Sequence, residues 1–326
     1  MIDPTDIFAI SSQKQFEKIA LKVFRFQYDN NSVYREFCEL LKVEKYNVKS
    51  LQEIPFLPIQ FFKTHEVVSN KDVIQETFTS SGTTGMVTSR HLVTDRTLYE
   101  QSYRQAFSHF YGNIEDYTVL ALLPSYLERQ GSSLIYMVED LISLTNNPDS
   151  GFYLFNHDEL IQKMITLDSQ GKSIILIGVT YALLDLIEKH DFSLKNTIIM
   201  ETGGMKGKRK EMIREELHEQ LCKGFGVSAI HSEYGMTELL SQAYSLGNGI
   251  FECPSWMQIL IRDTEDALTY ISNNKTGGIN VIDLANINSC SFIATQDLGK
   301  KYDNNSFEVL GRFDNSDIRG CNLMVL

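Results

Sequence analysis

The first third of the chain carries mainly the hydrophobic pattern of helices. Ser12 and Gln15 form a capping-box motif that predicts a helix start. The apolar residues that follow it at helical spacing are Phe16, Ile19, Ala20, Val23 and Phe24. A second, polar helix is predicted from about Asp95 to His109, with Asp95 as its N-cap. Between them, the stretch Pro55–Pro58 is expected to break regular structure, so residues 1–54 are predicted to form a helical N-terminal segment that packs on the main domain.

The middle of the chain alternates between short apolar runs and helical patterns. The runs typical of buried parallel strands are Thr118–Leu123, Ser173–Gly178, Thr197–Met200 and Val227–His231. Helices are predicted between the last three runs, through Ala182–Lys189 and Lys208–Cys222. This alternation predicts a parallel sheet with right-handed crossovers, so residues 55–250 are expected to form an α/β body.

The final third changes character. Its short β candidates are Trp256–Arg262, Gly278–Leu284, Cys290–Thr295 and Ser306–Leu310, separated by turns rich in Asn, Gly and Lys. Because helical patterns are lacking between them, residues 251–326 are predicted to form a smaller, mostly antiparallel β-rich subdomain with a short C-terminal tail.

Composition and charge narrow the class of protein. The 326 residues are 43% hydrophobic, which is enough for a sizeable core, and 42 acidic against 30 basic residues give a net charge of −12. That balance argues against a broad nucleic-acid-binding surface, because phosphates attract a basic face. The sequence contains no run of about 18 consecutive apolar residues, so no membrane span is predicted. The five cysteines are scattered and form no CxxC pair, which indicates reduced thiols and a cytoplasmic protein.

The strongest local motif is a loop rich in Ser, Thr and Gly that begins at Thr79. Its predicted phosphate-binding residues are Ser80, Ser81, Gly82, Thr83, Thr84 and Gly85. The glycines allow the backbone to approach a ligand closely, and the hydroxyl and N–H groups can surround an anion. The loop lacks the Gly-Lys-Ser/Thr of a Walker A motif. On composition alone, an ordinary polar loop is the alternative interpretation.

A second motif follows the predicted strand Val227–His231. It reads Glu-Tyr-Gly-Met-Thr-Glu over residues 233–238. In an open parallel sheet the ligand crevice lies beyond the carboxyl ends of the strands. Tyr234 can stack on a base, Thr237 can meet a phosphate and Glu238 can hold Mg²⁺. The alternative is a strand-end turn with a surface carboxylate.

Two weaker motifs come later in the chain. Asp297 lies in Thr-Gln-Asp-Leu-Gly at the end of a predicted strand, and Arg312 lies in Gly-Arg-Phe-Asp over residues 311–314. Taken alone, the first is a common turn and the second a solvated loop.

Together and in this order, the four motifs resemble those of the adenylate-forming superfamily, which includes acyl-CoA synthetases. The resemblance covers roughly residues 55–320. It implies an α/β fold in which the large N-terminal domain of that superfamily has a parallel-sheet body and a smaller β subdomain. It also implies that the loop Ser80–Gly85 and Arg312 bind ATP, with Tyr234 and Gly235 at the adenine, Asp297 at the ribose and Glu238 at Mg²⁺. Gly203 and Gly204 look like the superfamily's adenine-side turn.

The sequence departs from that superfamily in two places. The loop continues to Arg90 without the customary Pro-Lys pair, which leaves Arg90 or Lys206 as candidates for the missing positive charge. The chain also ends six residues after Gly320, so the mobile, lysine-bearing C-terminal domain is expected to be absent.

One branch of the superfamily is similar in both respects: the acyl-protein synthetases of the LuxE type. The segments that carry the likeness are residues 124–134 and 319–323. The resemblance implies that a carboxylic acid, most plausibly a fatty acid, is activated as an acyl-adenylate and then transferred to Cys321. It also implies an acyl-CoA reductase-like protein partner. Two alternatives stay open from the sequence: a coenzyme A or carrier-protein ligase with Cys321 idle, and a non-catalytic nucleotide-binding subunit.

Overall fold

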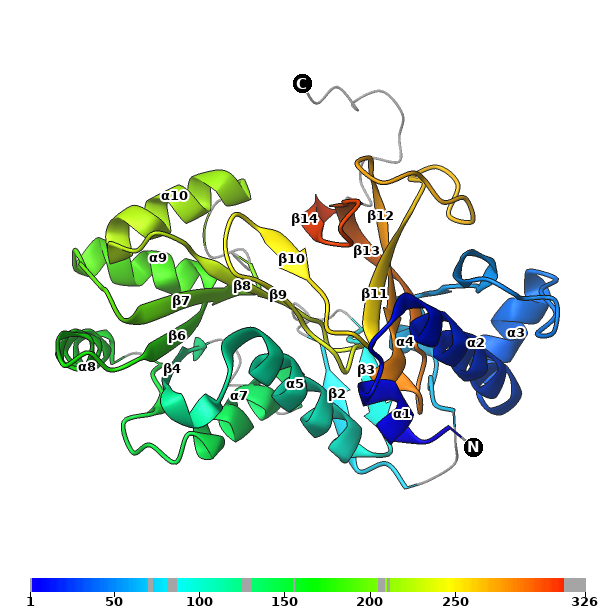
Figure 1. The fold of residues 1–326 in the computed structure, drawn as a ribbon, viewed down its shortest axis with the longest axis horizontal. Coiled ribbons are helices and arrows are strands. Elements are labelled where there is room, and N and C mark those ends of the chain that lie inside the picture. The colour runs from blue at the N-terminus through cyan, green and yellow to red at the C-terminus, as the bar shows by residue number, and fades with distance from the viewer. Residues whose placement is uncertain are drawn as a thin grey trace.

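The computed structural model describes residues 2–69, 73–80, 87–124, 131–154, 156–204, 209 and 212–313. Within them, one 12-stranded sheet extends through the molecule, and helices cover both faces of its parallel part (Figure 1). Neighbouring strands follow the order β11-β12-β13-β14-β10-β9-β8-β7-β6-β4-β5, and β1 pairs with β13. A separate hairpin of β2 and β3 stands beside this sheet.

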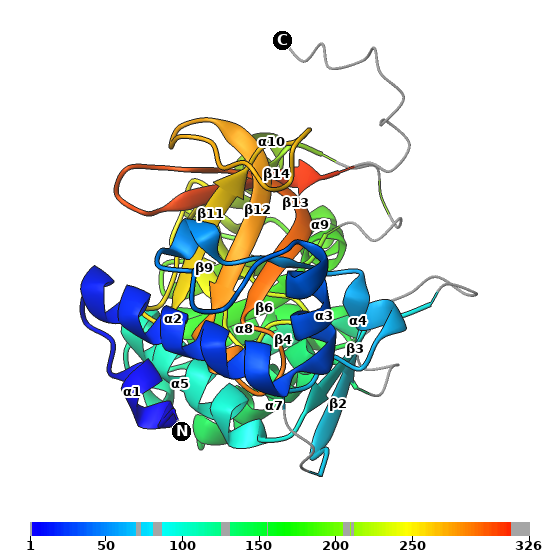
Figure 2. The ribbon, with the colours of Figure 1, turned by 90° about the vertical axis from the view of Figure 1, so that its right-hand side faces the viewer.

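The N-terminal segment is helical, as predicted. It contains α1 (Pro4–Phe8), α2 (Gln13–Asn30), α3 (Ser32–Leu40) and the short 3₁₀ helix Leu51–Glu53. Ser12 caps α2 by accepting a hydrogen bond from the Gln15 backbone N–H, and the Gln15 side chain accepts from the backbone of Ser11. Figure 2 shows α2 and α3 lying across the antiparallel strands. The ring of Phe292 on β13 packs against Phe24 of α2 and Tyr34 of α3.

The parallel part contains the predicted strands and crossover helices, and also two helices and a short strand between its first two predicted strands that were not predicted. Its elements in chain order are α5 (Arg96–Tyr111), β4 (Thr118–Leu122), α7 (Ser133–Leu144), β5 (Gly151–Phe152), α8 (His157–Ser169), β6 (Ile174–Val179), α9 (Thr180–Lys189), β7 (Thr197–Thr202), α10 (Arg214–Phe225) and β8 (His231–Tyr234). Strands β4 to β8 pair in parallel. The helices α9 and α10 lie on one face and α5 and α7 on the other (Figure 1). Asp95 caps α5, as predicted.

The antiparallel part continues the same sheet. It consists of β9 (Ala243–Ser245), β10 (Ile250–Glu252), β11 (Met257–Arg262), β12 (Thr276–Asp283), β13 (Phe292–Lys301) and β14 (Phe307–Arg312). A 3₁₀ turn, η3 (Leu284–Asn286), links β12 to the segment before β13. Strand β14 lies between β13 and β10, so it joins the antiparallel strands to the parallel ones. The predicted division at residues 54 and 250 stays a prediction.

Three expectations about local structure were wrong. The stretch Pro55–Pro58 does not break regular structure throughout, because Leu57–Pro58 form β1, a two-residue edge strand parallel to β13, where proline is tolerated. Strand β8 begins at His231 and not at Val227, because Gly226 ends α10 with φ of +69° and the chain needs several residues to reach the sheet. Asp297 lies within β13 and not at its end, since the strand alternates inward and outward residues as far as Lys301.

Other elements had no clear signal in the sequence. The remaining ones are α4 (Phe61–Thr64), β2 (Glu76–Thr79), β3 (Arg90–Val93) and the 3₁₀ turn Ile114–Asp116. The described residues contain no helix that is long and apolar enough to cross a membrane.

Candidate active site

Three of the sequence motifs meet at one end of the sheet. The hydroxyl of Tyr234, at the end of β8, donates a hydrogen bond to Asp297 Oδ2 on β13 at 2.8 Å. Asp297 Oδ1 accepts from Arg312 Nε on β14 at 3.2 Å. Tyr234 and Asp297 are buried, whereas the Arg312 side chain is 80% exposed. Tyr234 and Asp297 are 63 residues apart in sequence and Asp297 and Arg312 are 15 apart, and the sheet brings all three into contact.

The register of the sheet explains this contact. Asp297 pairs with Arg312 across β13 and β14, and β14 pairs with β10, which in turn pairs with β9 beside β8. A shift in register between Leu298 and Gly299 changes the local twist next to Asp297. Burial raises the pKa of Tyr234 well above its ordinary value, so its phenol stays protonated and can donate to the carboxylate.

The backbone of the Thr-Glu segment is clamped from two sides. The Nδ1 of His91, on β3, lies 2.8 Å from the carbonyl oxygen of Thr237, and its Nε2 lies 3.0 Å from Asn286 Oδ1. Asn286 Nδ2 donates to the carbonyl oxygen of Glu238 at 2.8 Å. His91 is fully buried, and burial lowers its pKa to about 4, so near pH 7 the neutral ring carries one N–H and donates to one of these two oxygens. The clamp therefore fixes the two residues expected to face the phosphates and the metal.

A buried carboxylate holds the chain just after this segment. Asp283 Oδ2 accepts hydrogen bonds from the backbone N–H groups of Leu240 at 2.7 Å and Ser241 at 3.0 Å. Its Oδ1 accepts from the Ser241 hydroxyl at 2.5 Å and the Ala285 N–H at 3.2 Å. Asp283 thus ties η3 to the turn after Glu238.

Glu238 has the surroundings expected of a ligand for a single cation. It is buried, burial raises its pKa, and no ion pair to it is found in the described part of the chain. The same residues contain no group of three or more His, Cys, Asp and Glu side chains that could hold a metal. One carboxylate suits Mg²⁺ when substrate phosphates and water complete its octahedron.

Two other carboxylates at this edge lie on opposite faces of the sheet. Glu201 on β7 accepts from Arg214 at 3.0 Å and Ser232 at 2.8 Å. Burial alone would raise the pKa of Glu201, but these bonds and His218 keep it below its ordinary value. Among the described contacts, the Glu233 carboxylate accepts one hydrogen bond, from Thr202 Oγ1 at 2.6 Å. Burial raises the pKa of Glu233 to about 7. The two environments separate the pKa values of neighbouring acids, a pattern typical of functional sites.

The phosphate loop is described only at its base. Ser80 and Ser89 close it, since the Ser80 N–H donates to the Ser89 carbonyl oxygen at 3.1 Å and the Ser89 N–H donates to Ser80 Oγ at 2.9 Å. The predicted ligands Ser81, Gly82, Thr83, Thr84 and Gly85 lie outside the described residues. Strands β2 and β3 form the hairpin that carries this loop, and His91 lies on the second of them.

The other predicted residues fall around this centre. Gly203 follows β7 with φ of +70°, a conformation that favours glycine, and its carbonyl oxygen accepts from Thr180. An added Cβ at Gly235 would lie 2.5 Å from Glu233 Oε1, so the Glu233 carboxylate would have to move to make room for it. The added Cβ of Gly204 would have open space. Arg90 is half exposed, 3.8 Å from Glu66, and Lys206 lies outside the described residues.

Comparison with known proteins identifies the family of this chain. The family model described as acyl-protein synthetase, LuxE, matches residues 2–116 and 132–326. The chain belongs to this family. A long-chain-fatty-acid–luciferin-component ligase from Vibrio harveyi is 23% identical over 97% of this chain and 89% of its own length. The Aliivibrio fischeri protein of the same name is 22% identical over the same shares. The resemblance to the LuxE type that the sequence indicated is therefore confirmed.

Solved structures show the fold of this LuxE-family chain. A 2-hydroxyisobutyryl-CoA ligase in complex with 2-HIB-AMP and CoA aligns with a TM-score of 0.67 and 12% identity, over 93% of this chain and 68% of that one. ATP-bound MatB from Rhodopseudomonas palustris aligns with a TM-score of 0.52 and 17% identity, over 72% of this chain. The aligned part is only 47% of the MatB chain. The predicted adenylate-forming fold is confirmed, and the chain belongs with the acyl-protein synthetases of the LuxE family.

Sequence reasoning missed the residues that hold the LuxE-family site in shape. His91, Asp283 and Asn286 each stand alone in the sequence, and their roles depend on contacts more than 40 residues away. A usable signal existed only for Asp283, as an acidic residue ending a strand of otherwise apolar pattern. His231 Nδ1, at the start of β8, lies 3.2 Å from the Tyr111 hydroxyl on the α5 side of the sheet.

Proposed function

We propose that this protein activates a long-chain fatty acid as its acyl-adenylate and then carries the acyl group as a thioester on Cys321. In the first step, a carboxylate oxygen of the acid bonds to the α-phosphorus of ATP and pyrophosphate leaves. In the second, the Cys321 thiolate attacks the acyl carbonyl carbon, the carbon–oxygen bond to phosphate breaks and AMP leaves. The observation that carries the proposal is the Tyr234–Asp297–Arg312 contact, which assembles separate nucleotide motifs into one site.

The residues of the site have distinct roles in this scheme. Asp297 has its second carboxylate oxygen close to the exposed Arg312, which suits recognition of ribose hydroxyl groups. Thr237 and the loop from Ser80 to Gly85 supply neutral donors to the phosphates. Glu238 would hold Mg²⁺, which neutralises charge on the phosphates as pyrophosphate leaves. The clamp by His91 and Asn286 keeps Thr237 and Glu238 in place before the substrates arrive.

The chemistry of the other cysteines supports the choice of Cys321. Burial raises the pKa of Cys38 and Cys253 to about 12 and raises the pKa of Cys222 and Cys290 as well. A thiol must be ionised to attack an acyl group, so these four are poor nucleophiles near neutral pH. Cys321 lies outside the described residues, in a segment that also contains Arg319. The nearby positive charge favours a thiolate.

The experiment separates the two half-reactions. Acid-dependent exchange of pyrophosphate into ATP reports the adenylate, and mass spectrometry of the intact protein after incubation with ATP and hexadecanoic acid reports the thioester. Cys321→Ser should retain exchange and lose the hydroxylamine-labile acyl mass. Cys222→Ser is the matched control and should keep that mass. Full labelling of Cys321→Ser would reject the tail cysteine and favour transfer to coenzyme A or a carrier thiol.

The thioester also requires a partner enzyme that uses its acyl group. We propose an acyl-CoA reductase-like protein as the partner, because reduction of a thioester releases the acyl group as an aldehyde and regenerates the thiol. Acylated protein mixed with such a reductase and its reduced nicotinamide cofactor should lose its acyl mass as aldehyde forms.

A further inference from the structure

The short helix α4 carries a lysine, Lys63, next to the strand that follows the phosphate loop. The chain is anchored on two elements just before this residue. The Ile59 N–H donates to the Ala294 carbonyl oxygen on β13 at 3.0 Å. The ring of Phe62, which is fully buried, packs edge-on against the ring of His91 on β3, with 5.7 Å between the ring centroids. Figure 2 shows α4 beside β3, so the fold fixes the place of Lys63 there.

Lys63 is close to the proposed Mg²⁺ ligand, Glu238. The contacts of one buried ring indicate this, because His91 touches Phe62 on α4 and also lies 2.8 Å from the carbonyl oxygen of Thr237. The electrostatics of Glu238 agree. Burial raises the pKa of Glu238, whereas hydrogen bonds and the nearby positive charges of two side chains, Arg312 and Lys63, lower it.

The other cations near the site are already paired. Arg312 donates to Asp297 at 3.2 Å, and Arg90 lies 3.8 Å from Glu66. Lys63 is half-buried and takes part in no salt bridge within the portion of the chain that the structure describes. Its ammonium group is therefore available for a negatively charged ligand at this place.

The phosphates of ATP require more positive charge than one Mg²⁺ supplies. Enzymes that transfer phosphoryl groups combine the metal ion with a basic side chain at the terminal phosphates. The phosphate loop has no basic residue from Ser80 to Ser89, so here the charge has to come from another element. A lysine suits this task, because its ammonium group is a point charge on a flexible stem and can follow the phosphates as they move apart.

We propose that the Lys63 ammonium group binds the β- and γ-phosphates of ATP and is a catalytic residue of the adenylation step. As the bond from the α-phosphorus to the bridging oxygen breaks, its electron pair moves onto pyrophosphate, and the ammonium group stabilises this charge. Lys63 thus takes the role for which Arg90 and Lys206 were the candidates in the sequence. This inference rests on the proposed function, because ATP is consumed in the first step of that function.

The first test compares ATP with AMP, which lacks the β- and γ-phosphates. Binding to the full chain is measured by titration calorimetry in the presence of Mg²⁺. Lys63→Met keeps an unbranched side chain without the charge, so the Kd for ATP should rise about tenfold or more, since contacts between a cation and phosphate are strong. The Kd for AMP should stay unchanged. Lys63→Arg should recover part of the ATP affinity.

The matched control is Lys49→Met. It removes the same charge from an exposed position of the same N-terminal segment and should bind ATP as wild type does. In pyrophosphate exchange, Lys63→Met should also raise the KM for pyrophosphate, whereas the KM for the fatty acid should not change. A lysine that only supports the fold would not separate the two substrates in this way.

The outcomes distinguish this inference from the function beneath it. Wild-type protein that binds ATP but exchanges pyrophosphate with no acid would refute the proposed function. An unchanged Kd for ATP in Lys63→Met, an equal loss of ATP and AMP affinity, or the same loss in Lys49→Met would refute the assignment of Lys63 alone.

A measurement on the wild-type protein decides if Lys63→Met does not fold by circular dichroism. The lysines are acetylated with an N-hydroxysuccinimide ester of acetic acid, and the modified peptides are quantified by mass spectrometry. Saturating ATP with Mg²⁺ should protect Lys63 from acetylation, whereas AMP should not. Equal acetylation of Lys63 with and without ATP would overturn the assignment.

Discussion

His91 Nδ1 lies 2.8 Å from the carbonyl oxygen of Thr237, and this contact joins the strand after the phosphate loop to the segment that carries Glu238. The two residues are 146 positions apart. Because His91 also touches Asn286, which donates to the Glu238 carbonyl oxygen, one buried ring and one amide determine how two motifs face each other. The phosphate loop and the proposed Mg²⁺ ligand are thereby coupled before any substrate binds.

Removing this coupling should impair catalysis more than nucleotide binding. His91→Leu keeps an apolar side chain in a buried place but loses both contacts, so we expect kcat for pyrophosphate exchange to fall about 10- to 100-fold. The KM for ATP should change less, and a higher Mg²⁺ concentration should be needed. His91→Gln, which can still donate to the Thr237 carbonyl oxygen, should recover part of the rate. His109→Ala, on the exposed side of α5, is the control. An equal rise in KM and fall in kcat with unchanged Mg²⁺ dependence would argue for a purely structural role.

Tyr234→Phe removes the hydrogen bond to Asp297 while keeping the ring. Among the described residues, the Asp297 carboxylate then keeps only the exposed Arg312 as a hydrogen-bond partner, so we expect the KM for ATP to rise about tenfold. The free energy of unfolding should fall by about 1 kcal/mol in urea titration. Tyr46→Phe is a suitable comparison because Tyr46 is 68% exposed. An unchanged KM for ATP in Tyr234→Phe would show that the Tyr234–Asp297 hydrogen bond has no role in nucleotide recognition.

Glu238→Gln should abolish most of the acid-dependent exchange. The amide keeps the shape of the side chain but cannot supply the charge that Mg²⁺ requires, so a loss of about 100-fold or more is expected. The melting temperature should hold or rise, because burial disfavours the ionised carboxylate. Glu252→Gln, at an exposed position of β10, should behave as wild type. Exchange at the wild-type rate in folded Glu238→Gln would show that Mg²⁺ is bound by other ligands and not by Glu238.

Glu233 should make stability depend on pH. Its pKa is raised from 4.5 to about 7 in the folded protein, so the folded state keeps a proton that the unfolded state releases as pH rises between these values. Its contribution is fully present below pH 4.5 and is lost as pH rises through 7. Glu233→Gln stays neutral, so relative to wild type it should gain about 1 kcal/mol or more between pH 5 and pH 8 in urea unfolding. Parallel pH profiles of the two proteins would show that Glu233 is already ionised at pH 5.

The sequence predicted the parts of the fold whose physical cause is local. The run Ser173–Gly178 has no polar residue after Ser173 because both faces of a central parallel strand are buried, and this signal predicted β6 to within one residue at each end. The Asp95 cap is equally local. The predicted position of β8 was wrong because His231–Tyr234 mixes polar and aromatic residues and has no strand pattern of its own. Its strand geometry comes from pairing with β7 and β9.

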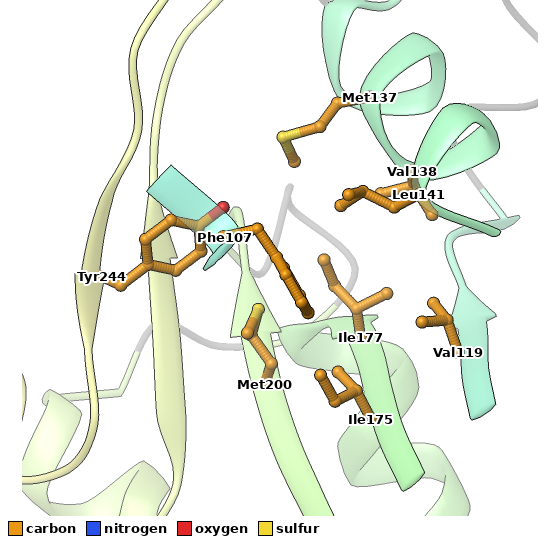
Figure 3. A pocket seen from close by; sticks show the side chains of 9 residues that line it. All are labelled: Phe107, Val119, Met137, Val138, Leu141, Ile175, Ile177, Met200 and Tyr244. Carbon is orange, nitrogen blue, oxygen red and sulfur yellow. The ribbon is translucent and has the colours of Figure 1, made fainter. Parts of the chain in front are cut away.

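The candidate site divides along the same line. Tyr234, Asp297 and Arg312 could be assigned because their motifs are recognisable as short strings. Their mutual contact depends on β14 entering the sheet beside β13, which no local pattern records. His91 and Asp283 are buried polar residues whose partners lie far away in sequence, so only the folded structure reveals them. The small apolar cavity between the parallel strands and the helices α5 and α7 is of the same kind, because its lining comes from three strands of the parallel part, β9 and two helices (Figure 3).

The place of β14 has a consequence for how the protein is made. Strand β14 pairs with β10, which lies about 58 residues earlier in the sequence (308 − 250 = 58). In the sheet, β14 stands between the antiparallel strands and the parallel ones. During synthesis from the N-terminus, β10 and β13 each present an unpaired edge until Phe307–Arg312 leaves the ribosome. Ribosome-bound chains that stop before Phe307 should therefore recruit chaperones and aggregate on release. Assembly of the nucleotide site therefore waits for the translation of β14, long after Tyr234 has been made.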